Sequence, residues 1–239
     1  MIIAIVRPDD PPNEVDVCIV IDVLRATTTA AVLCDRMGPT GELVTVGSPS
    51  DLARLPPRAR GYAIFSELAE LADDDAPGQR FDNSPTVARD VELAGRTPVL
   101  VTTNGTVAIE LAKRFAREVV LASFANLTAA LTYVRERGPR SVAVMPAGNI
   151  REGQRVIEDD GCAEVIRGML AGEAVDVEAV LAGCRRDARI VRRSARIPDD
   201  VAYCLALDAV AVVPHVVESR DRNLTLLRMT VGKNRSQLA

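Results

Sequence analysis

Short β-branched runs alternate with Ala- and Leu-rich segments along this 239-residue chain, and this alternation constrains the fold more than any other feature. Residues 15–21 (VDVCIVI) are apolar almost throughout, which is typical of a strand buried on both faces of a parallel sheet. The segment 22–38 then predicts a turn and a helix that ends at Gly38. Repeated strand–helix units of this kind predict an α/β fold with a mostly parallel central sheet and helices on both faces.

The same alternation predicts the remaining strands and helices. Further strands are expected at 42–46, 99–102, 118–122, 141–145, 209–213 and 224–229. Further helices are expected after the turn at 102–106, and at 126–137, from about 158, at 174–186, 189–194 and 199–206. The least regular stretch, 66–85, contains the acidic run 73–75 and is expected to be a surface loop. We expect one α/β domain over residues 1–239.

Composition excludes several classes of function. The chain has one histidine, so a Ser-His-Asp triad would have to use His215, and a site with several histidine ligands is impossible. Aromatic residues make up 3% of the chain and the net charge is -4. Nucleic-acid binding normally uses stacking aromatics and a basic surface, so we expect no nucleic-acid partner.

The cysteines and the N-terminal segment bear on the compartment. The five cysteines are scattered and never form a CxxC pair, which argues against a zinc or redox motif. The first ten residues (MIIAIVRPDD) hold an apolar stretch too short for a signal peptide. No apolar run approaches the roughly 18 residues of a membrane span. The sequence therefore predicts a cytoplasmic protein that does not enter a membrane.

Three strand–helix junctions carry candidate chemistry, because ligands bind beyond the carboxyl ends of parallel strands. The first is DVLRATTT at 22–29. Asp22 can hold Mg²⁺, act as a nucleophile, or pair with Arg25, whose guanidinium suits phosphate or sulfonate. Thr27 and Thr28 can cap the following helix or bind an anion there. A purely structural Asp–Arg pair that pins the loop explains the residue types equally well.

Two further turns offer polar groups. Thr103, Asn104, Gly105 and Thr106 form a turn that exposes N–H groups to an anionic ligand, or else an ordinary helix cap. Asn83 and Ser84 precede Pro85 in a second turn, for which simple capping is the favoured interpretation.

The third junction precedes the segment 158–162 (EDDGC). Glu158 and Asp159 complement the helix dipole in the first turn, or coordinate Mg²⁺ through their oxygens. Cys162, one turn later, is either a small buried residue or a nucleophile, and burial is the favoured interpretation.

Together these segments resemble the 2-phosphosulfolactate phosphatase (ComB-type) family. The matching stretches are VIDVLRATTTA at 20–30, NSP at 83–85, VTTNGT at 101–106, EDDGCA at 158–163 and the late segment 202–216. The resemblance implies a three-layer α/β/α sandwich and a Mg²⁺-dependent phosphatase that acts in coenzyme M biosynthesis. The family usually carries a Gly-Glu-Arg-Gly-Gly-like segment before the NSP turn, whereas 66–70 here reads SELAE, which keeps Glu67 and lacks the arginine.

We therefore expect hydrolysis of 2-phospho-3-sulfolactate, or of a similar small anionic phospho-acid. In this hypothesis Glu158, Asp159 and Glu67 hold Mg²⁺, Arg25 clamps the phosphate, and Asp22 is the nucleophile or a metal ligand. The alternatives are a phosphatase with another small substrate and a non-catalytic binder of a phosphorylated metabolite. A homodimer is expected only as the base rate for small α/β enzymes.

Overall fold

One continuous sheet organises the protein. The computed structural model describes residues 1–68, 78–221 and 224–231. Within them, ten strands form a single sheet in the order β1-β8-β2-β7-β9-β10-β3-β6-β4-β5. Their bounds, in that order, are Ile2–Ile5, Ser141–Pro146, Val15–Ile21, Ala116–Ala122, Val212–Asp221, Leu224–Val231, Leu43–Val46, Thr97–Val101, Tyr62–Phe65 and Gly78–Phe81.

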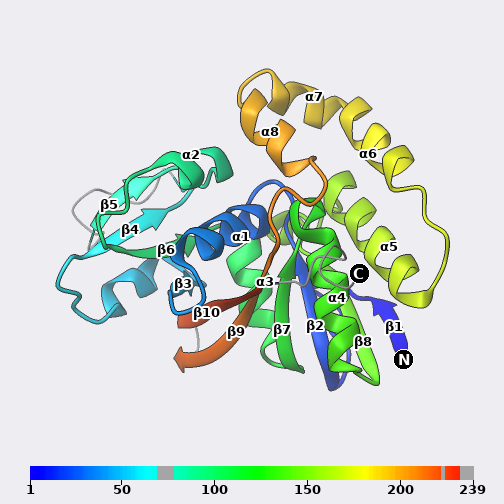
Figure 1. Cartoon of the computed structure of the whole chain (residues 1–239), viewed down its shortest axis with the longest axis horizontal. Coiled ribbons are helices and arrows are strands. Elements are labelled where there is room, and N and C mark those ends of the chain that lie inside the picture. Colours follow the sequence, from blue (N-terminus) through cyan, green and yellow to red (C-terminus); the bar gives the residue numbers. More distant parts are fainter. Residues whose placement is uncertain (69–77, 222–223, 232–239) are drawn as a thin grey trace, which may run out of the picture.

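The sheet consists of two parallel halves joined by an antiparallel pair. Strands β1, β8, β2 and β7 are mutually parallel, as are β3, β6, β4 and β5. Between them, β9 and β10 run antiparallel to each other and to their outer neighbours β7 and β3. Three antiparallel steps reverse the strand direction, so the two halves run in opposite senses. Because sheet twist accumulates across the strands, β2, β7 and β8 stand upright in Figure 1 while β4 and β5 lie across the view.

Helices cover both faces, which confirms the predicted three-layer α/β/α sandwich. Helices α1 (Ala26–Met37), α2 (Pro85–Asp90) and α3 (Gly105–Ala112) pack on one face. Helices α4 (Leu127–Arg137) and α5 (Ile157–Ala171) pack on the other, together with α6 (Val177–Arg186), α7 (Ala188–Ser194) and α8 (Pro198–Cys204). Strand β2 is buried on both faces, because Ile19 and Ile21 join one core and Cys18 and Val20 join the other.

Three short 3-10 helices complete the described elements. They are η1 (Pro49–Arg54), η3 (Phe124–Asn126) and η4 (Ile150–Glu152). Leu52 of η1 packs over a third apolar cluster, formed by one face of β3, β4, β6 and β10.

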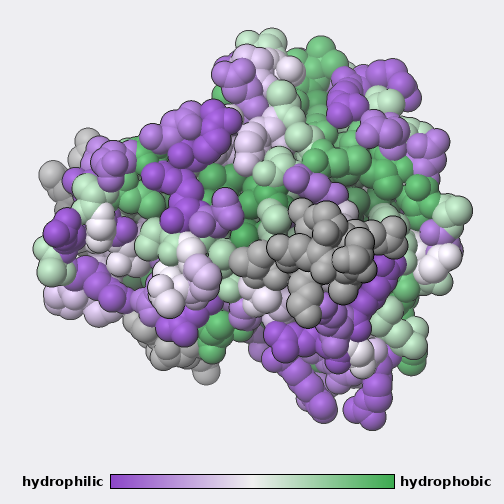
Figure 2. Space-filling model, in the orientation of Figure 1, coloured by the Kyte–Doolittle hydropathy of each residue, from purple (hydrophilic) through white to green (hydrophobic). Residues whose placement is uncertain are grey.

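Helices α6, α7 and α8 form an arch that returns toward α2 at the top of Figure 1. Helix α8 contacts α2, although the two are more than a hundred residues apart in the sequence. The surface over α2 is strongly hydrophilic in Figure 2. The arch therefore brings a late helical segment to the edge of the sheet where the early strand–helix turns lie.

The expected strands and helices are all present, most with ends shifted by a few residues, whereas the strand expected at 209–213 is found at Val212–Asp221. Three further strands, β1, β4 and β5, were not predicted. Each has only four residues, too short for a periodic pattern to stand out. The expectation of a surface loop over 66–85 is wrong for Gly78–Phe81, which forms β5 at the sheet edge. The acidic run 73–75 lies outside the described residues. In the described ranges, no helix is both long and apolar enough to cross a bilayer.

Candidate active site

A cavity of about 250 Å³ lies where turns from both halves of the sheet converge. Six of the predicted site residues line it, and four residues that were not predicted complete the wall. The predicted residues are Asp22, Arg25, Glu67, Asn83, Thr103 and Asn104, and the others are Leu24, Arg193, Arg196 and Ile197. The turns after β2, β4, β5 and β6 supply the six predicted residues, so the convergence of strand ends positions this site.

Asp22 follows the last residue of β2 and is almost fully buried. The backbone N–H of Ala26 donates to Asp22 Oδ1 at 3.3 Å. Burial raises the pKa of Asp22 to about 7, and the nearby carboxylates of Glu67 and Glu158 add to the increase. This carboxyl group can therefore hold or release a proton near neutral pH.

Gly105 allows helix α3 to begin directly against Asp22. A Cβ atom at Gly105 would collide with the Cβ of Ala26 and would lie 2.8 Å from Asp22 Oδ2. Only glycine leaves room for this close approach of backbone to side chain. Gly105 is a predicted site residue, and the structure assigns it to the packing behind Asp22 rather than to the cavity wall.

Glu67 joins three separate turns. Its Oε1 accepts the backbone N–H of Thr103 at 2.9 Å and the hydroxyl of Thr103 at 3.1 Å. Its Oε2 accepts Nδ2 of Asn83 at 2.8 Å. Asn83 is buried, yet its Oδ1 has no hydrogen-bond partner among the described residues. An unpaired buried acceptor beside two carboxylates indicates a position for a ligand that donates to, or is coordinated by, oxygen.

Asn104 connects this group to the loop after β8. Its Nδ2 donates to the Thr103 hydroxyl at 3.1 Å, and its Oδ1 accepts the backbone N–H of Ile150 at 3.0 Å. Asn104 occupies the N-cap position of α3, but its side chain makes no capping hydrogen bond. Thr106 is buried, and it exchanges hydrogen bonds with Thr102 instead of facing the cavity.

Glu158 and Asp159 lie behind the cavity and do not line it. Asp159 accepts the backbone N–H of Val23 at 2.8 Å and that of Gly148 at 3.0 Å, so it ties the ends of β2 and β8 together. Burial holds the pKa of Asp159 well above its usual range, and the carboxylates of Asp22 and Glu158 act in the same direction. Glu158 is buried and forms an ion pair with Arg189.

Arg25 pairs with two carboxylates that were not predicted as its partners. Its guanidinium contacts Asp82 at 2.7 and 3.0 Å and Asp200 at 2.6 Å. Asp200 also accepts the hydroxyls of Ser84 at 2.7 Å and Thr86 at 2.6 Å. The structure therefore replaces the alternative of an Asp22–Arg25 pair with a network that joins α1, α2 and α8.

Ser84 caps α2 as expected, since its Oγ accepts the backbone N–H of Val87 at 3.0 Å. The capping prediction for Thr27 and Thr28 is wrong, because both lie inside α1, whose N-cap is Arg25. Their buried hydroxyls lie 2.8 Å from the carbonyl oxygen of Asp22 and 3.0 Å from that of Val23, respectively.

Cys162 is fully buried in the core under α5, and burial raises the pKa of its thiol further above the usual value. This placement favours the packing interpretation over a nucleophile. All five cysteines are free and buried.

Arg193, in the last turn of α7, and Arg196, two residues beyond the helix, are the charged cavity residues that sequence reasoning missed. Their only local signal is two arginines three residues apart at a helix end, which is also typical of favourable dipole placement. Nothing in the local pattern indicates that α7 returns to the end of β2, more than 160 residues earlier in the chain.

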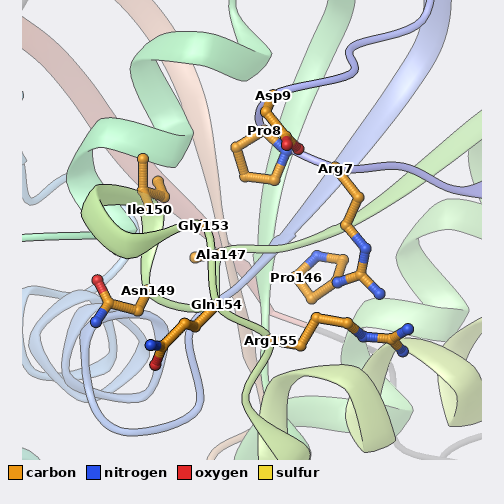
Figure 3. Close-up of a pocket in the computed structure, with 11 residues that line it drawn as sticks. Arg7, Pro8, Asp9, Pro146, Ala147, Asn149, Ile150, Gly153, Gln154 and Arg155 are labelled. Carbon is orange, nitrogen blue, oxygen red and sulfur yellow. The ribbon is translucent and has the colours of Figure 1, made fainter.

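A second cavity, of about 130 Å³, lies beside the first, on the other side of the loop after β8. Figure 3 shows the guanidiniums of Arg7 and Arg155 on one side of it, with Pro8, Pro146 and Ile150 around the opening. Both arginines pair with Asp160 at 2.6 Å, so one carboxylate offsets part of their positive charge. Asp9 also lines this cavity, but the unpaired buried Oδ1 of Asn83 lies at the first cavity.

The family profile described as 2-phosphosulpholactate phosphatase matches residues 5–219. The chain belongs to this family. Relatives named "Probable 2-phosphosulfolactate phosphatase" are similar to it over most of their length. That of Thermus thermophilus is 34% identical over 199 residues, covering 82% of this chain and 77% of the relative. That of Gloeobacter violaceus is 31% identical over 220 residues, covering 85% and 89%.

A third relative with the same name, from Deinococcus radiodurans, is 30% identical over 233 residues, covering 91% of this chain and 94% of the relative. Every segment that lines the large cavity lies within the matched region of the family profile. The site and the family match therefore concern the same part of the chain.

The large cavity carries oxygen donors of the kind that a hard cation takes. In the described parts of the chain, no three His, Cys, Asp or Glu side chains gather closely enough to form a metal cluster by themselves. Mg²⁺ does not require such a cage, since it usually takes one or two carboxylates and keeps waters or substrate phosphate oxygens. Asp22, Glu67 and the unpaired Asn83 Oδ1 supply oxygen donors of this kind on one wall.

Proposed function

We propose that this protein is a Mg²⁺-dependent phosphatase that hydrolyses 2-phospho-3-sulfolactate, or a similar small phospho-acid, to the hydroxy acid and inorganic phosphate. The observation that carries the proposal is the cavity in which Glu67, held by Thr103 and Asn83, lies with Asp22. Membership of the family supports the substrate class.

Asp22, Glu67 and Asn83 are the residues that would hold the cation. Of the cation ligands predicted from the sequence, Glu67 lines the cavity, whereas Glu158 and Asp159 do not. When bound, the cation would offset the negative charge of the phosphoryl group as it is transferred.

The remaining residues act by positioning. Thr103 and Asn83 fix the orientation of the Glu67 carboxylate through three hydrogen bonds. Arg25, paired with Asp82 and Asp200, fixes the entrance to α1 and thereby the position of Asp22. Holding charged groups in position before the reaction contributes to phosphoryl transfer, because fixed charges supply most of the stabilisation of its transition state.

The deciding experiment measures phosphate release from a panel of small phospho-acids, with Mg²⁺ and with EDTA. We expect release from 2-phospho-3-sulfolactate with Mg²⁺ and none with EDTA. Glu67→Gln should abolish release, whereas Glu164→Gln, a carboxylate exposed on α5 and remote from the cavity, should leave it unchanged. Binding of the panel without any phosphate release would instead support the alternative of a non-catalytic binder.

Three expectations remain predictions: a cytoplasmic location, a homodimer, and the absence of a nucleic-acid partner. Gel filtration with light scattering tests the second of them directly.

A further inference from the structure

Two arginines face the same cavity as the carboxylates. Arg193 is on the last turn of α7 and Arg196 follows it, and both line the cavity together with Asp22 and Glu67. The cavity is therefore lined by carboxylates from the strand-end turns and by two guanidiniums from the arch. Such a lining suits a ligand that carries more than one kind of charged group.

The guanidiniums of the arch have unused hydrogen-bonding capacity. Arg193 donates one N–H, from Nη1, to the carbonyl of Leu24 at 3.1 Å. Arg196 has no side-chain hydrogen bond or ion pair with any residue that the structure describes. Arg25, by contrast, is already occupied by Asp82 and Asp200. A guanidinium offers five N–H donors, so Arg193 and Arg196 retain most of theirs.

The turn that carries these arginines is held at both ends. The backbone N–H groups of Arg196 and Ile197 both donate to the carbonyl of Arg193 at 2.9 Å. On one side, Arg189 pairs with buried Glu158. On the other, Asp200 pairs with Arg25. Two ion pairs therefore anchor the segment on either side of the two arginines, whose exposed side chains line the cavity.

We propose that Arg193 and Arg196 form a clamp for a second acid group of the substrate, separate from the phosphate. This inference rests on the proposed function, and it assigns two residues to the carboxylate or sulfonate that the proposed substrate carries beside its phosphate. The planar fork of arginine matches the paired oxygens of both groups. A cavity of about 250 Å³ admits a compact molecule of this kind.

The test compares two esters that differ in one acid group. Phosphoglycolate carries a carboxylate next to its phosphate ester, and ethyl phosphate lacks it. For Arg193→Gln and Arg196→Gln we expect KM for phosphoglycolate and for 2-phospho-3-sulfolactate to rise about tenfold or more each, with kcat/KM for ethyl phosphate within about twofold. Arg192→Gln removes the same charge from the same helix outside the cavity, and it should change neither.

The conservative variant Arg196→Lys separates charge from geometry, because lysine keeps the charge without the fork. It should recover part of the loss for the acid-bearing esters. Equal losses for ethyl phosphate and the acid-bearing esters in both Gln variants would overturn the clamp, since the arginines would then serve the phosphate or the fold. Unchanged kinetics for all esters would overturn it as well.

Calorimetric titration with 3-sulfolactate, which has no phosphate, keeps the clamp testable if the wild type hydrolyses no ester. Sulfolactate binding that is lost in the double variant and kept in Arg192→Gln would support the clamp while the phosphatase proposal fails. No binding by the wild type, or equal binding by the double variant, would overturn the clamp itself.

Discussion

The guanidinium of Arg25 lies 2.6 Å from Oδ2 of Asp200, a residue 175 positions later in the chain. This ion pair joins the start of α1, which follows Asp22, to the first turn of α8, which follows the two arginines of the arch. Both side chains are largely buried, with relative exposures of 11% and 4%. This ion pair therefore holds the turn that carries Asp22 to the arch that carries the two arginines, and Arg25 itself lines the cavity.

Asp200→Asn should destabilise the protein markedly. The change removes one of the two carboxylates that pair with Arg25, and a hydrogen bond to a charged group contributes about 1.5–3 kcal/mol. The hydroxyls of Ser84 and Thr86 lose an anionic acceptor at the same time. Urea unfolding measures the change, and Asp199→Asn, exposed on the same helix, is the matched control, with an expected change below about 0.5 kcal/mol. Equal stability of the two variants would show that the network does not anchor the arch.

Gly105→Ala should impair activity more than its small size suggests. The added methyl would collide with Ala26 and approach Asp22 Oδ2 to 2.8 Å, so α3 or the Asp22 carboxylate must move. Overpacking of this kind costs about 1–3 kcal/mol of stability. The control is Gly183→Ala on α6, where nothing lies within 4 Å of the new Cβ and helix propensity predicts a gain of up to about 1 kcal/mol. Opposite signs of the two shifts in Tm are the expected result.

Asp22→Asn should abolish both phosphate release and the Mg²⁺-dependent rise in Tm, because it removes an anionic oxygen donor from the proposed cation site. The wild type should show no covalent phosphoenzyme after acid quench, since Asp22 is assigned to the cation and not to attack on phosphorus. Asp35→Asn, an exposed carboxylate on α1, should behave like the wild type. A trapped phospho-aspartate at position 22 would reassign Asp22 as the nucleophile.

Stability should depend on pH through His215, the only histidine. Burial lowers the pKa of His215 below its ordinary value of 6.5, and Arg137 and Arg228 act in the same direction, while the Val213 carbonyl and Glu118 oppose them. Between the folded pKa and 6.5 the unfolded chain binds the proton more readily. The free energy of unfolding contributed by His215 therefore falls as pH is lowered below 6.5.

Asp22 changes the free energy of unfolding with pH in the opposite direction. Its pKa is raised to about 7, so the folded state binds its proton more readily than the unfolded chain does. The measurement is therefore the difference between wild type and His215→Gln in urea unfolding from about pH 5.5 to 7.5. The variant should lose less stability on acidification than the wild type. Parallel pH dependences for the two proteins would contradict the assignment.

Much of the fold was predictable because its signals are local. The apolar run 15–21 indicated a strand buried on both faces, and β2 occupies those residues with side chains in two separate cores. Repeated strand–helix units indicated the layered α/β architecture. The reversal between the two halves of the sheet was not predictable, because it depends on where β9 and β10 insert between β7 and β3.

The candidate site was likewise predictable only in part. The sequence by itself determined that Asp22 and Thr103 follow strand ends, where ligands bind in such sheets, and both residues line the cavity. Only the tertiary structure decided which groups meet. Glu67 with Asn83 and Thr103, Arg25 with Asp200, and the return of Arg193 to the cavity all join segments far apart in the chain. Local patterns encode helix and strand periods, whereas these contacts are set by sheet order and twist, which arise from packing over the whole chain.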